Sequence, residues 1–208
     1  MAITYHIHPE HPQPHKIKKA VDELRDGAVM LYPTDTVWAL GCDLNSKNGV
    51  ERIRTLKRLS SDKPLTFLCH SLANIAHFAR VSDPAYSIIR HLIPGPYTFI
   101  LPATKLVPKL VQNPKRKSCG IRVPDHPICN ALLEWLDNPI VSMSAVIPFQ
   151  EEIATSDDLL ANYEKLVDII ISDESSYRTA VSTVIDMTKD EFFIEREGLG
   201  LDKAKQYL

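Results

Sequence analysis

The sequence lacks the short motifs that identify many common classes of enzyme. Its 208 residues include only seven glycines, which form neither the GxxxxGK[ST] phosphate loop nor the GxGxxG dinucleotide loop. The HExxH motif and the serine elbow are absent as well. No apolar run reaches the roughly 18 residues of a membrane helix, and the chain does not open with a signal-peptide pattern. We therefore expect a cytoplasmic protein with no membrane segment, whose chemistry uses none of these motifs.

Cysteine is also scarce, and its spacing excludes two familiar kinds of site. There is no CxxC pair and no zinc-ribbon spacing among Cys42, Cys69, Cys119 and Cys129. In a reducing compartment such isolated cysteines are usually buried free thiols. Cys119 follows a basic stretch, the setting in which a thiol becomes reactive. We nevertheless expect no catalytic role for any of the four and no metal site.

Charge is balanced over the whole chain but not along it. With 24 basic and 26 acidic residues the net charge is −2, and 44% of the residues are hydrophobic, as in an ordinary globular protein with one substantial core. One short region carries no acid before Asp125 and contains Lys105, Lys109, Lys115, Arg116, Lys117 and Arg122. This region is either a solvated basic loop or an anion-binding or RNA-facing patch.

Histidines gather near the N-terminus and raise the question of a metal site. The cluster consists of His6, His8, His11 and His15. His6 and His8 would share one face of a strand, as two metal ligands can. No third ligand follows at a useful spacing and prolines interrupt the run, so a surface tract is the favoured interpretation. The acidic pairs at 151–152 and 157–158 are expected to be solvated or helix-start acids rather than a catalytic pair.

Apolar runs and helical periodicities alternate along the chain. Strands are predicted at residues 3–7, 28–32, 37–42, 65–69, 97–101, 140–144, 167–171, 182–186 and 192–196, and a further strand is predicted to end at residues 121–123. Helices are predicted to begin near residues 14, 46, 71, 83, 127 and 159. Several neighbouring strands are joined by too little chain for a helical crossover, so the sheet cannot be purely parallel. We expect one domain over residues 1–208, of the α+β (mixed α/β) class, with a twisted open mixed sheet and helices on its faces.

The most informative segment is YPTDTVWALG at residues 32–41, in which Thr34 and Thr36 flank Asp35 between two predicted strands. Polar side chains trapped between strands must find partners, either in the protein or in a ligand. The segment is therefore either a tight turn with a satisfied aspartate or part of a binding site. Similar polar residues recur at the edges of later apolar runs, which favours the binding site.

Cationic and hydroxyl residues recur at the predicted ends of strands and helices, the usual place of ligand groups in a sheet-based fold. They are Thr34, Thr36, Lys57, Arg58, Ser118, Arg122, Ser142, Ser144, Ser182, Thr183 and Arg196. Hydroxyls and guanidinium groups bind carboxylate and phosphate oxygens. A site rich in cations and poor in nucleophiles suits phosphoryl or nucleotidyl transfer, in which positioning and charge neutralisation supply most of the catalysis. The alternative for each single hydroxyl is that it only ends a strand.

Seven segments together resemble a known family. They are YPTDTVWALG (32–41), SDKPL (61–65), PGPYTFIL (94–101), GIRVPDHP (120–127), SMSA (142–145), STVID (182–186) and REG (196–198). In this order they resemble the YrdC-like family of threonylcarbamoyl-AMP synthases, with a motif-bearing core at about residues 15–200. The opening IHPEHPQ makes the chain most similar to the YciO branch of that family.

The resemblance implies a twisted open sheet around a concave, basic cavity. It implies ATP, L-threonine and bicarbonate as substrates, with Mg²⁺ bound through the ATP phosphates and no metal site on the protein itself. The threonine amine would capture the carbonyl carbon, and the resulting carbamate oxygen would attack the α-phosphate and release pyrophosphate. The product, threonylcarbamoyl-AMP, serves the threonylcarbamoyl modification of adenosine in tRNA.

The resemblance also assigns individual residues. The positions that match the L-threonine pocket are Thr34, Arg122, Ser144 and Ser182. The positions on the ATP side are Lys57, Arg58, Ser118, Ser142 and Arg196. Arg58 is a neighbour rather than a true match, because it lies between the two members of the family's KxR motif. Arg122 would fork onto the threonine carboxylate.

Three positions depart from the family pattern. KxR ends in Leu59, SAN ends in Val146, and Leu68 stands where many synthases carry a histidine, with His70 two residues on. Removing an arginine from a phosphate site eliminates a charge-assisted interaction of about 1.5–3 kcal/mol, or roughly one to two decades in rate or affinity.

These observations leave two main hypotheses about function. The first is a threonylcarbamoyl-AMP synthase, weakened by the departures. The second is a catalytically degenerate module of the same fold that binds a nucleotide, tRNA or double-stranded RNA. A transfer enzyme with another amine as acceptor ranks below both, because the threonine-side residues are complete.

Overall fold

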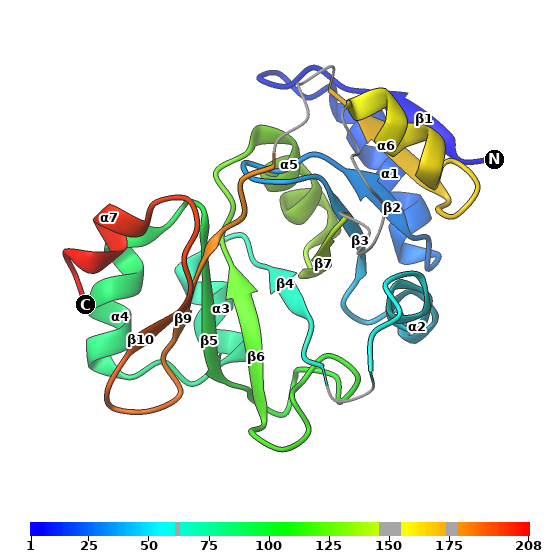
Figure 1. The fold of residues 1–208 in the computed structure, drawn as a ribbon. Helices are drawn as coiled ribbons and strands as arrows, with labels where there is room; N and C mark the ends of the chain where they lie inside the picture. The colour runs from blue at the N-terminus through cyan, green and yellow to red at the C-terminus, as the bar shows by residue number, and fades with distance from the viewer. Residues whose placement is uncertain (61–62, 146–154, 174–178) are drawn as a thin grey trace.

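The computed structural model describes residues 1–60, 63–145, 155–173 and 179–208 (Figure 1). The strands are β1 (Ile3–His6), β2 (Met30–Tyr32), β3 (Ala39–Asp43), β4 (Thr66–Leu68), β5 (Tyr97–Pro102), β6 (Ser118–Arg122), β7 (Ile140–Ser144), β8 (Ile169–Ser172), β9 (Thr183–Asp186) and β10 (Phe193–Arg196). The helices are α1 (Pro14–Arg25), α2 (Lys47–Leu56), α3 (Leu72–Phe78), α4 (Asp83–Leu92), α5 (Pro127–Leu136), α6 (Ser156–Tyr163) and α7 (Leu201–Lys205).

All ten strands in the described part of the chain belong to one sheet, in the order β1-β8-β2-β3-β7-β4-β6-β5-β9-β10. Parallel pairs such as β4–β6 and β5–β9 alternate with antiparallel pairs such as β2–β3 and β3–β7. The sheet runs across the molecule from β1 to β10 (Figure 1). The structure thus confirms the predicted mixed, open sheet in a single domain.

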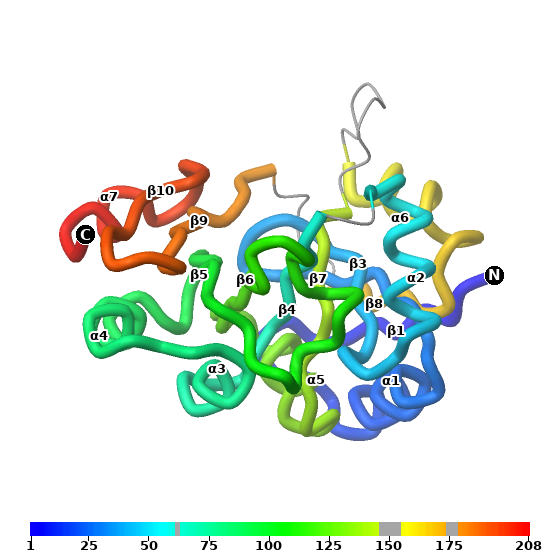
Figure 2. Tube along the Cα trace, turned by 90° about the horizontal axis from the view of Figure 1, so that it is seen from below, coloured from blue at the N-terminus to red at the C-terminus, as the bar shows by residue number. Residues whose placement is uncertain are grey.

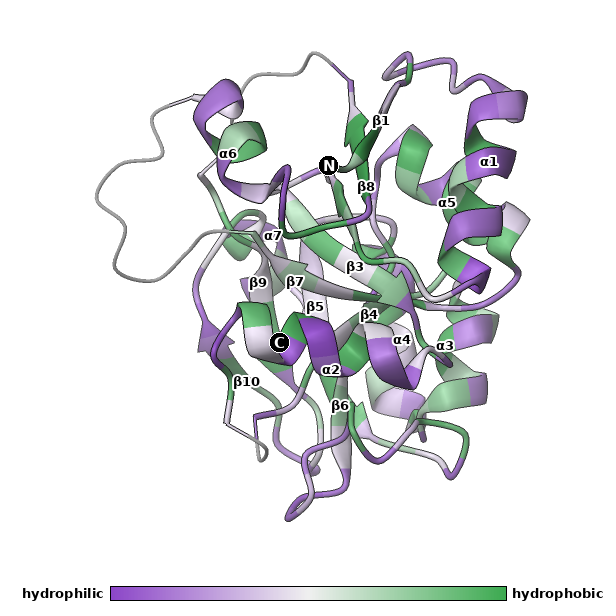
Figure 3. Cartoon of the chain, turned by 90° about the vertical axis from the view of Figure 1, so that its right-hand side faces the viewer, coloured by the Kyte–Doolittle hydropathy of each residue, from purple (hydrophilic) through white to green (hydrophobic). Residues whose placement is uncertain are grey.

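Helices cover both faces of this sheet. Figure 2 shows α1, α3, α4 and α5 on one side of the strands and α2 and α6 on the other. Helix α1 illustrates why: Pro14 starts the helix, and its buried stripe is Ile17, Ala20, Val21 and Leu24. Figure 3 shows hydrophilic residues along α1, which lies at the outer edge of the molecule in that view. No helix among the described residues is long and apolar enough to cross a membrane.

The hydrophobic core has two parts. In one, Leu24 of α1 and Leu132 of α5 are buried with Met30 and Tyr32 of β2. The other part includes Phe67 of β4 and reaches the far end of the sheet. Tyr32 is fully buried, which raises the pKa of its hydroxyl well above the usual value. This rigid sheet fixes the ends of its central strands, and those ends carry most of the predicted site residues.

The structure differs from the sequence prediction mainly at helix ends. Helix α6 begins three residues before its predicted start, because Thr155 accepts a hydrogen bond from the Asp158 amide and caps it. Asp157 and Asp158 occupy its first turn, so they are helix-start acids as predicted. Residues 151–152 lie outside the described residues. Helix α7 was not predicted, since its five residues are too few to establish a period.

The structure also shows where the cysteines and one of the clustered histidines lie. All four cysteines are buried free thiols. Burial raises the pKa of Cys119 to about 12, so its basic neighbours do not make it a reactive thiol. His8 lies beyond the end of β1 and accepts hydrogen bonds from the Glu10 and His11 amides. Within the described residues no group of three or more His, Cys, Asp or Glu side chains could hold a metal ion.

Gly41 of β3 provides a stability prediction. A Cβ at this position would lie 2.7 Å from Tyr32 Cε1 and 3.0 Å from Ile140 Cγ2. We expect Gly41→Ala to lower the free energy of unfolding by about 1–3 kcal/mol, because the tyrosine ring must move within a packed core. Urea unfolding of the purified proteins measures the change, with the exposed-site variant Ala76→Val as a control. A free energy equal to that of the unmodified protein would contradict this account of the packing.

Candidate functional site

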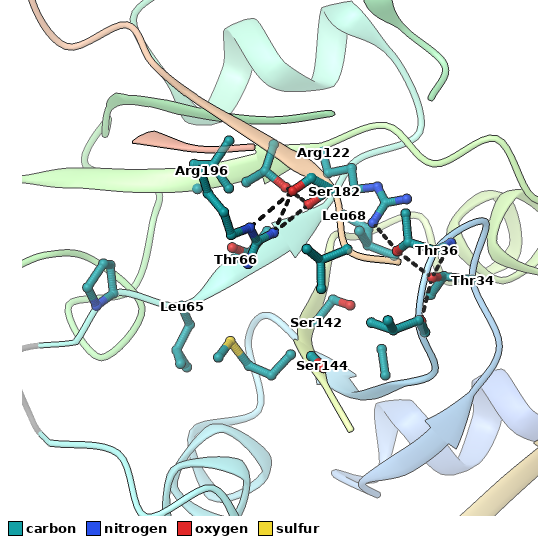
Figure 4. Close-up of a pocket in the computed structure, with 18 of the residues that line it drawn as sticks. Thr34, Thr36, Leu65, Thr66, Leu68, Arg122, Ser142, Ser144, Ser182 and Arg196 are labelled. Carbon is teal, nitrogen blue, oxygen red and sulfur yellow. Dashed lines mark hydrogen bonds between the residues drawn. The ribbon is translucent and has the colours of Figure 1, made fainter. Parts of the chain in front are cut away.

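A cavity of about 200 Å³ lies over the central strands of the sheet (Figure 4). Its lining includes seven residues predicted from the sequence, namely Thr34, Thr36, Arg122, Ser142, Ser144, Ser182 and Arg196. These residues come from strands and loops that are widely separated in the chain, from the turn after β2 to the end of β10. The fold therefore gathers these dispersed polar residues into one site.

The pleat of the sheet explains why these residues meet. Alternate residues of a strand share a face, so Gly120 and Arg122 of β6 point the same way, as do Ser142 and Ser144 of β7. Thr66 of β4 lies opposite both Gly120 and Ser142, which joins the three strands in one row. A Cβ on Gly120 would lie 2.7 Å from the Thr66 hydroxyl oxygen. Glycine therefore keeps the floor of the cavity open at its centre.

Thr34 lies in the turn between β2 and β3, and hydrogen bonds within this turn hold its side chain in place. Thr34 Oγ1 donates to the Val37 carbonyl (2.7 Å) and accepts from the Thr36 amide (3.1 Å). The two threonine hydroxyl oxygens are 3.1 Å apart, and both side chains are buried. The two threonines of this segment thus form a hydrogen-bonded turn and also line the cavity. The turn interpretation offered by the sequence holds for them, and a binding site at this segment stays a prediction.

Arg122 is the buried cation of the cavity. Its side chain is 8% exposed, and its Nη2 forms a 2.5 Å ion pair with Asp35 Oδ1. Nη1 donates to Thr36 Oγ1 at 2.8 Å, and Nε donates to the Gly95 carbonyl at 3.4 Å. A buried guanidinium is tolerated only when its charge and donors are satisfied in this way.

Arg196 lies beside Ser182 and holds it through hydrogen bonds (Figure 4). Its guanidinium donates to the Ser182 carbonyl at 2.8 Å and to the Ser182 hydroxyl at 2.9 Å. That hydroxyl is also 3.0 Å from Thr98 Oγ1 of β5 (Figure 4). Burial and then the charge of Arg122 lower the pKa of Arg196.

The charge of the cavity favours an anionic ligand. Arg122 and Arg196 are its only charged lining residues in the described chain, and Asp35 neutralises only the first. Arg196 donates to uncharged oxygens of Ser182, so its positive charge has no counterion among these contacts. The remaining positive charge and the surrounding hydroxyls match a carboxylate or a phosphate.

Ser142 is held by Tyr32, a residue that was not assigned to the site from the sequence. The Tyr32 hydroxyl donates to Ser142 Oγ at 2.7 Å. Thr66 and Thr98 also line the cavity without having been predicted. The signal for Thr98 was present, since it is a polar residue within the apolar run of β5. Tyr32 gave no such signal, because nothing in a sequence shows where a buried tyrosine hydroxyl points.

Three residues predicted on the ATP side do not line the described cavity. Lys57 is buried at the C-terminal end of α2, and Arg58 beside it is exposed, with φ of 49°. Ser118 is buried at the start of β6, on the same face as Arg122 but two strand repeats away. Their assignment to ATP remains a prediction.

The departures from the family pattern fall in different surroundings. Leu59 is half-buried and packs against the hydrophobic core, while Leu68 is buried and lines the cavity. His70 is exposed and lies in a separate groove with His77. Val146 lies outside the described residues. The described lining contains no carboxylate, so any metal ion there would need ligands from a substrate.

Comparisons with known proteins identify the family. A family model named Sua5_yciO_yrdC, described as "Telomere recombination", matches residues 22–198. The chain therefore belongs to the Sua5/YciO/YrdC family. Within it, the chain is 39% identical over 202 residues to the uncharacterized protein YciO of Escherichia coli K12, which covers 96% of this chain and 97% of that protein. The crystal structure of E. coli YciO has a TM-score of 0.91 at 38% identity, over 98% of this chain and 99% of that chain.

Threonylcarbamoyl-AMP synthases are also similar to the chain, at lower identity. The synthase of Vibrio vulnificus YJ016 is 27% identical over 178 residues, or 84% of this chain and 95% of that enzyme. The crystal structure of Pyrococcus abyssi Sua5 complexed with L-threonine has a TM-score of 0.89 at 26% identity. That match covers all of this chain and 61% of the Sua5 chain.

Lys57 gives a prediction about pH. Burial, reinforced by the nearby charge of Lys63, lowers the pKa of Lys57 from 10.5 to about 8. Between pH 8 and 10.5 the unfolded chain binds more protons at this residue than the folded chain, so Lys57 makes stability rise with pH in this window. We expect Lys57→Met to remove that contribution. Denaturant unfolding at pH 7.5 and 9.5 measures it, and an equal pH dependence in both proteins would contradict it.

Proposed function

We propose that the protein is a threonylcarbamoyl-AMP synthase-like enzyme, which joins L-threonine, bicarbonate and ATP and releases pyrophosphate. The observation that carries this proposal is the buried cavity in which Arg122 and hydroxyl groups from the turn after β2, from β7 and from the start of β9 converge. The L-threonine complex of P. abyssi Sua5 supports it, because that structure shares this fold.

In this proposal Arg122 binds the carboxylate of L-threonine. Three of its five N–H donors are used within the protein, and the others are left for a ligand. Thr34, Ser144 and Ser182 lie around the cavity and would surround the rest of the amino acid. The bound threonine would then be oriented with its amine toward the centre of the cavity.

The reaction needs no nucleophile from the chain. The threonine amine attacks the carbonyl carbon of bicarbonate, and loss of water gives a carbamate. A carbamate oxygen then attacks the α-phosphate of ATP, and pyrophosphate leaves. Arg196, which donates to uncharged oxygens of Ser182, would stabilise the developing negative charge. Mg²⁺ would bind through the ATP phosphates, and Lys57, Arg58, Ser118 and Ser142 remain the proposed ATP-side residues.

The departures predict a slow enzyme. Leu59 has an apolar side chain that packs against the core. It therefore cannot replace the arginine of KxR as a phosphate ligand. Arg58 is exposed and has a left-handed backbone, whereas Lys57, the C-cap residue of α2, is buried. The two neighbouring side chains therefore lie in different surroundings. The absence of one charge-assisted hydrogen bond to phosphate costs about 1.5–3 kcal/mol.

A direct assay tests the proposal. Purified protein is incubated with labelled bicarbonate, L-threonine and Mg·ATP, and we expect threonine-dependent adenylate and pyrophosphate. Arg122→Gln should lower kcat/KM for L-threonine by roughly ten- to a hundredfold, because glutamine cannot form the charged hydrogen bonds to the carboxylate.

Arg52→Gln is the control, since Arg52 forms an equally short, 2.5 Å but more exposed ion pair with Asp168 away from the cavity. It should leave kcat/KM for L-threonine within about twofold of the unmodified protein. No pyrophosphate above background from the folded, unmodified protein would contradict the proposal.

RNA binding is a second candidate function, favoured by one observation. Residues 104–117, which lie between β5 and β6 and are here called the basic loop, are at one end of these two strands (Figure 1). Its exposed cations are Lys105, Lys109, Lys115, Arg116 and Lys117. Only Arg116 pairs with a carboxylate in the described chain, that of Asp186. The sixth cation of the run, Arg122, is instead buried in the cavity.

The basic loop is held in shape by its own hydrogen bonds. Asn113 Oδ1 accepts from the amides of Lys115 and Arg116, and Arg54 donates to the Leu110 carbonyl. The five exposed cations of the basic loop put like charges in one short segment, and a phosphodiester backbone would neutralise them. The loop therefore suits the tRNA or double-stranded RNA predicted from the sequence.

Charge variants test RNA binding independently of catalysis. We expect the triple variant Lys105→Gln, Lys109→Gln, Lys115→Gln to weaken tRNA binding and to reduce the salt dependence of log K by about 0.9 for each phosphate that the variant no longer neutralises. The control triple variant, Lys18→Gln, Lys19→Gln, Lys165→Gln, removes the same charge from exposed sites on α1 and after α6. Equal effects of the two variants in filter binding would contradict a site on the basic loop.

A further inference from the structure

Asp35 does not line the cavity, yet its carboxylate holds the arginine that does. The ion pair between Asp35 and Arg122 is nearly enclosed, with side chains 11% and 8% exposed. Asp35 is the only carboxylate that pairs with Arg122 in the described chain. An interaction this deep is screened little by salt or water, so it constrains the guanidinium strongly.

The contacts of Arg122 leave a defined set of donors for a ligand. Nε, Nη1 and Nη2 each donate one hydrogen bond within the protein. Each terminal nitrogen carries two N–H groups, so one N–H on Nη1 and one on Nη2 remain. Bidentate recognition of a carboxylate can use one N–H from each terminal nitrogen. The orientation of the guanidinium therefore decides where a carboxylate can bind.

The turn that carries Asp35 is itself rigid. The hydrogen bonds among Thr34, Thr36 and Val37 close it on both sides of the aspartate. Asp35 Oδ2 is buried and accepts no hydrogen bond from the described residues. The hydrogen bonding of this carboxylate is therefore directed to Arg122 through Oδ1.

We propose that Asp35 is a positioning residue, which fixes the Arg122 guanidinium so that its two remaining terminal N–H groups meet the carboxylate of an α-amino acid substrate. This inference rests on the proposed function for the identity of the ligand. Asp35 itself touches no substrate. It sets the position and orientation of the Arg122 guanidinium, and in this way it makes the cavity selective for a planar carboxylate.

A purely structural role makes a different prediction. If Asp35 only compensates a buried charge, its removal lowers stability and weakens every ligand of the cavity alike. If Asp35 positions Arg122, its removal weakens most the binding of those ligands that use the two terminal N–H groups of Arg122. L-Threonine and L-threoninamide separate the two cases, because the amide lacks the carboxylate.

Binding measured by calorimetry is the first test. We expect Asp35→Asn to weaken L-threonine binding by roughly ten- to a hundredfold while ATP binding changes by less than about twofold. The preference for L-threonine over L-threoninamide should fall by a similar factor. Asp168→Asn, which breaks the other short Arg–Asp pair, should leave that preference unchanged. An unchanged preference in Asp35→Asn would overturn the proposal.

Nitrogen-15 NMR of the arginine side chains tests the positioning without any ligand. In the unmodified protein and in Asp168→Asn we expect Arg122 Nη signals that show restricted rotation of the guanidinium. In Asp35→Asn we expect these signals to be averaged. Signals that stay restricted in Asp35→Asn would overturn the role of Asp35, whatever L-threonine does. Absence of L-threonine binding by the unmodified protein would instead overturn the proposed function, so the two failures are distinguishable.

Discussion

The ion pair between Arg122 and Asp35 is the constraint on which the site depends. A guanidinium at the end of a central strand is costly to bury, and three contacts from two separate loops satisfy it. Those contacts tie the turn after β2 and the segment before β5 to the end of β6. The same bonds that make the arginine tolerable in the interior are those that we propose direct it toward a ligand.

The sheet provides the platform for that arrangement. Its pleat brings one face of β4, β6 and β7 together, and Gly120 keeps the middle of that face free of side chains. Hydroxyl groups stand around this floor, and their positions are set by partners behind them, as Tyr32 sets Ser142. The cavity is therefore organised before any ligand arrives, which lowers the entropic cost of binding.

The sequence was sufficient for the strands, because period-two runs and turn residues are local signals. It was also sufficient for seven of the lining residues, which stand at the ends of such runs. It was not sufficient for contacts between distant segments. Nothing local shows that Asp35 lies against Arg122 or Thr98 against Ser182, since these pairs are made by the topology of the sheet. For the same reason the sequence presents Arg122 and the cations of residues 105–117 as one basic cluster. In the fold Arg122 is buried in the cavity, whereas the other cations are exposed on the basic loop.

We propose above all that this cavity binds an α-amino acid through Arg122, and a crystal structure of the protein with L-threonine tests this binding. We expect a threonine carboxylate on the two terminal nitrogens of Arg122, with the Asp35 ion pair intact and the amine toward the centre of the cavity. A threonine bound elsewhere, or one whose carboxylate contacts Arg196 while Arg122 contacts only the protein, would contradict the account.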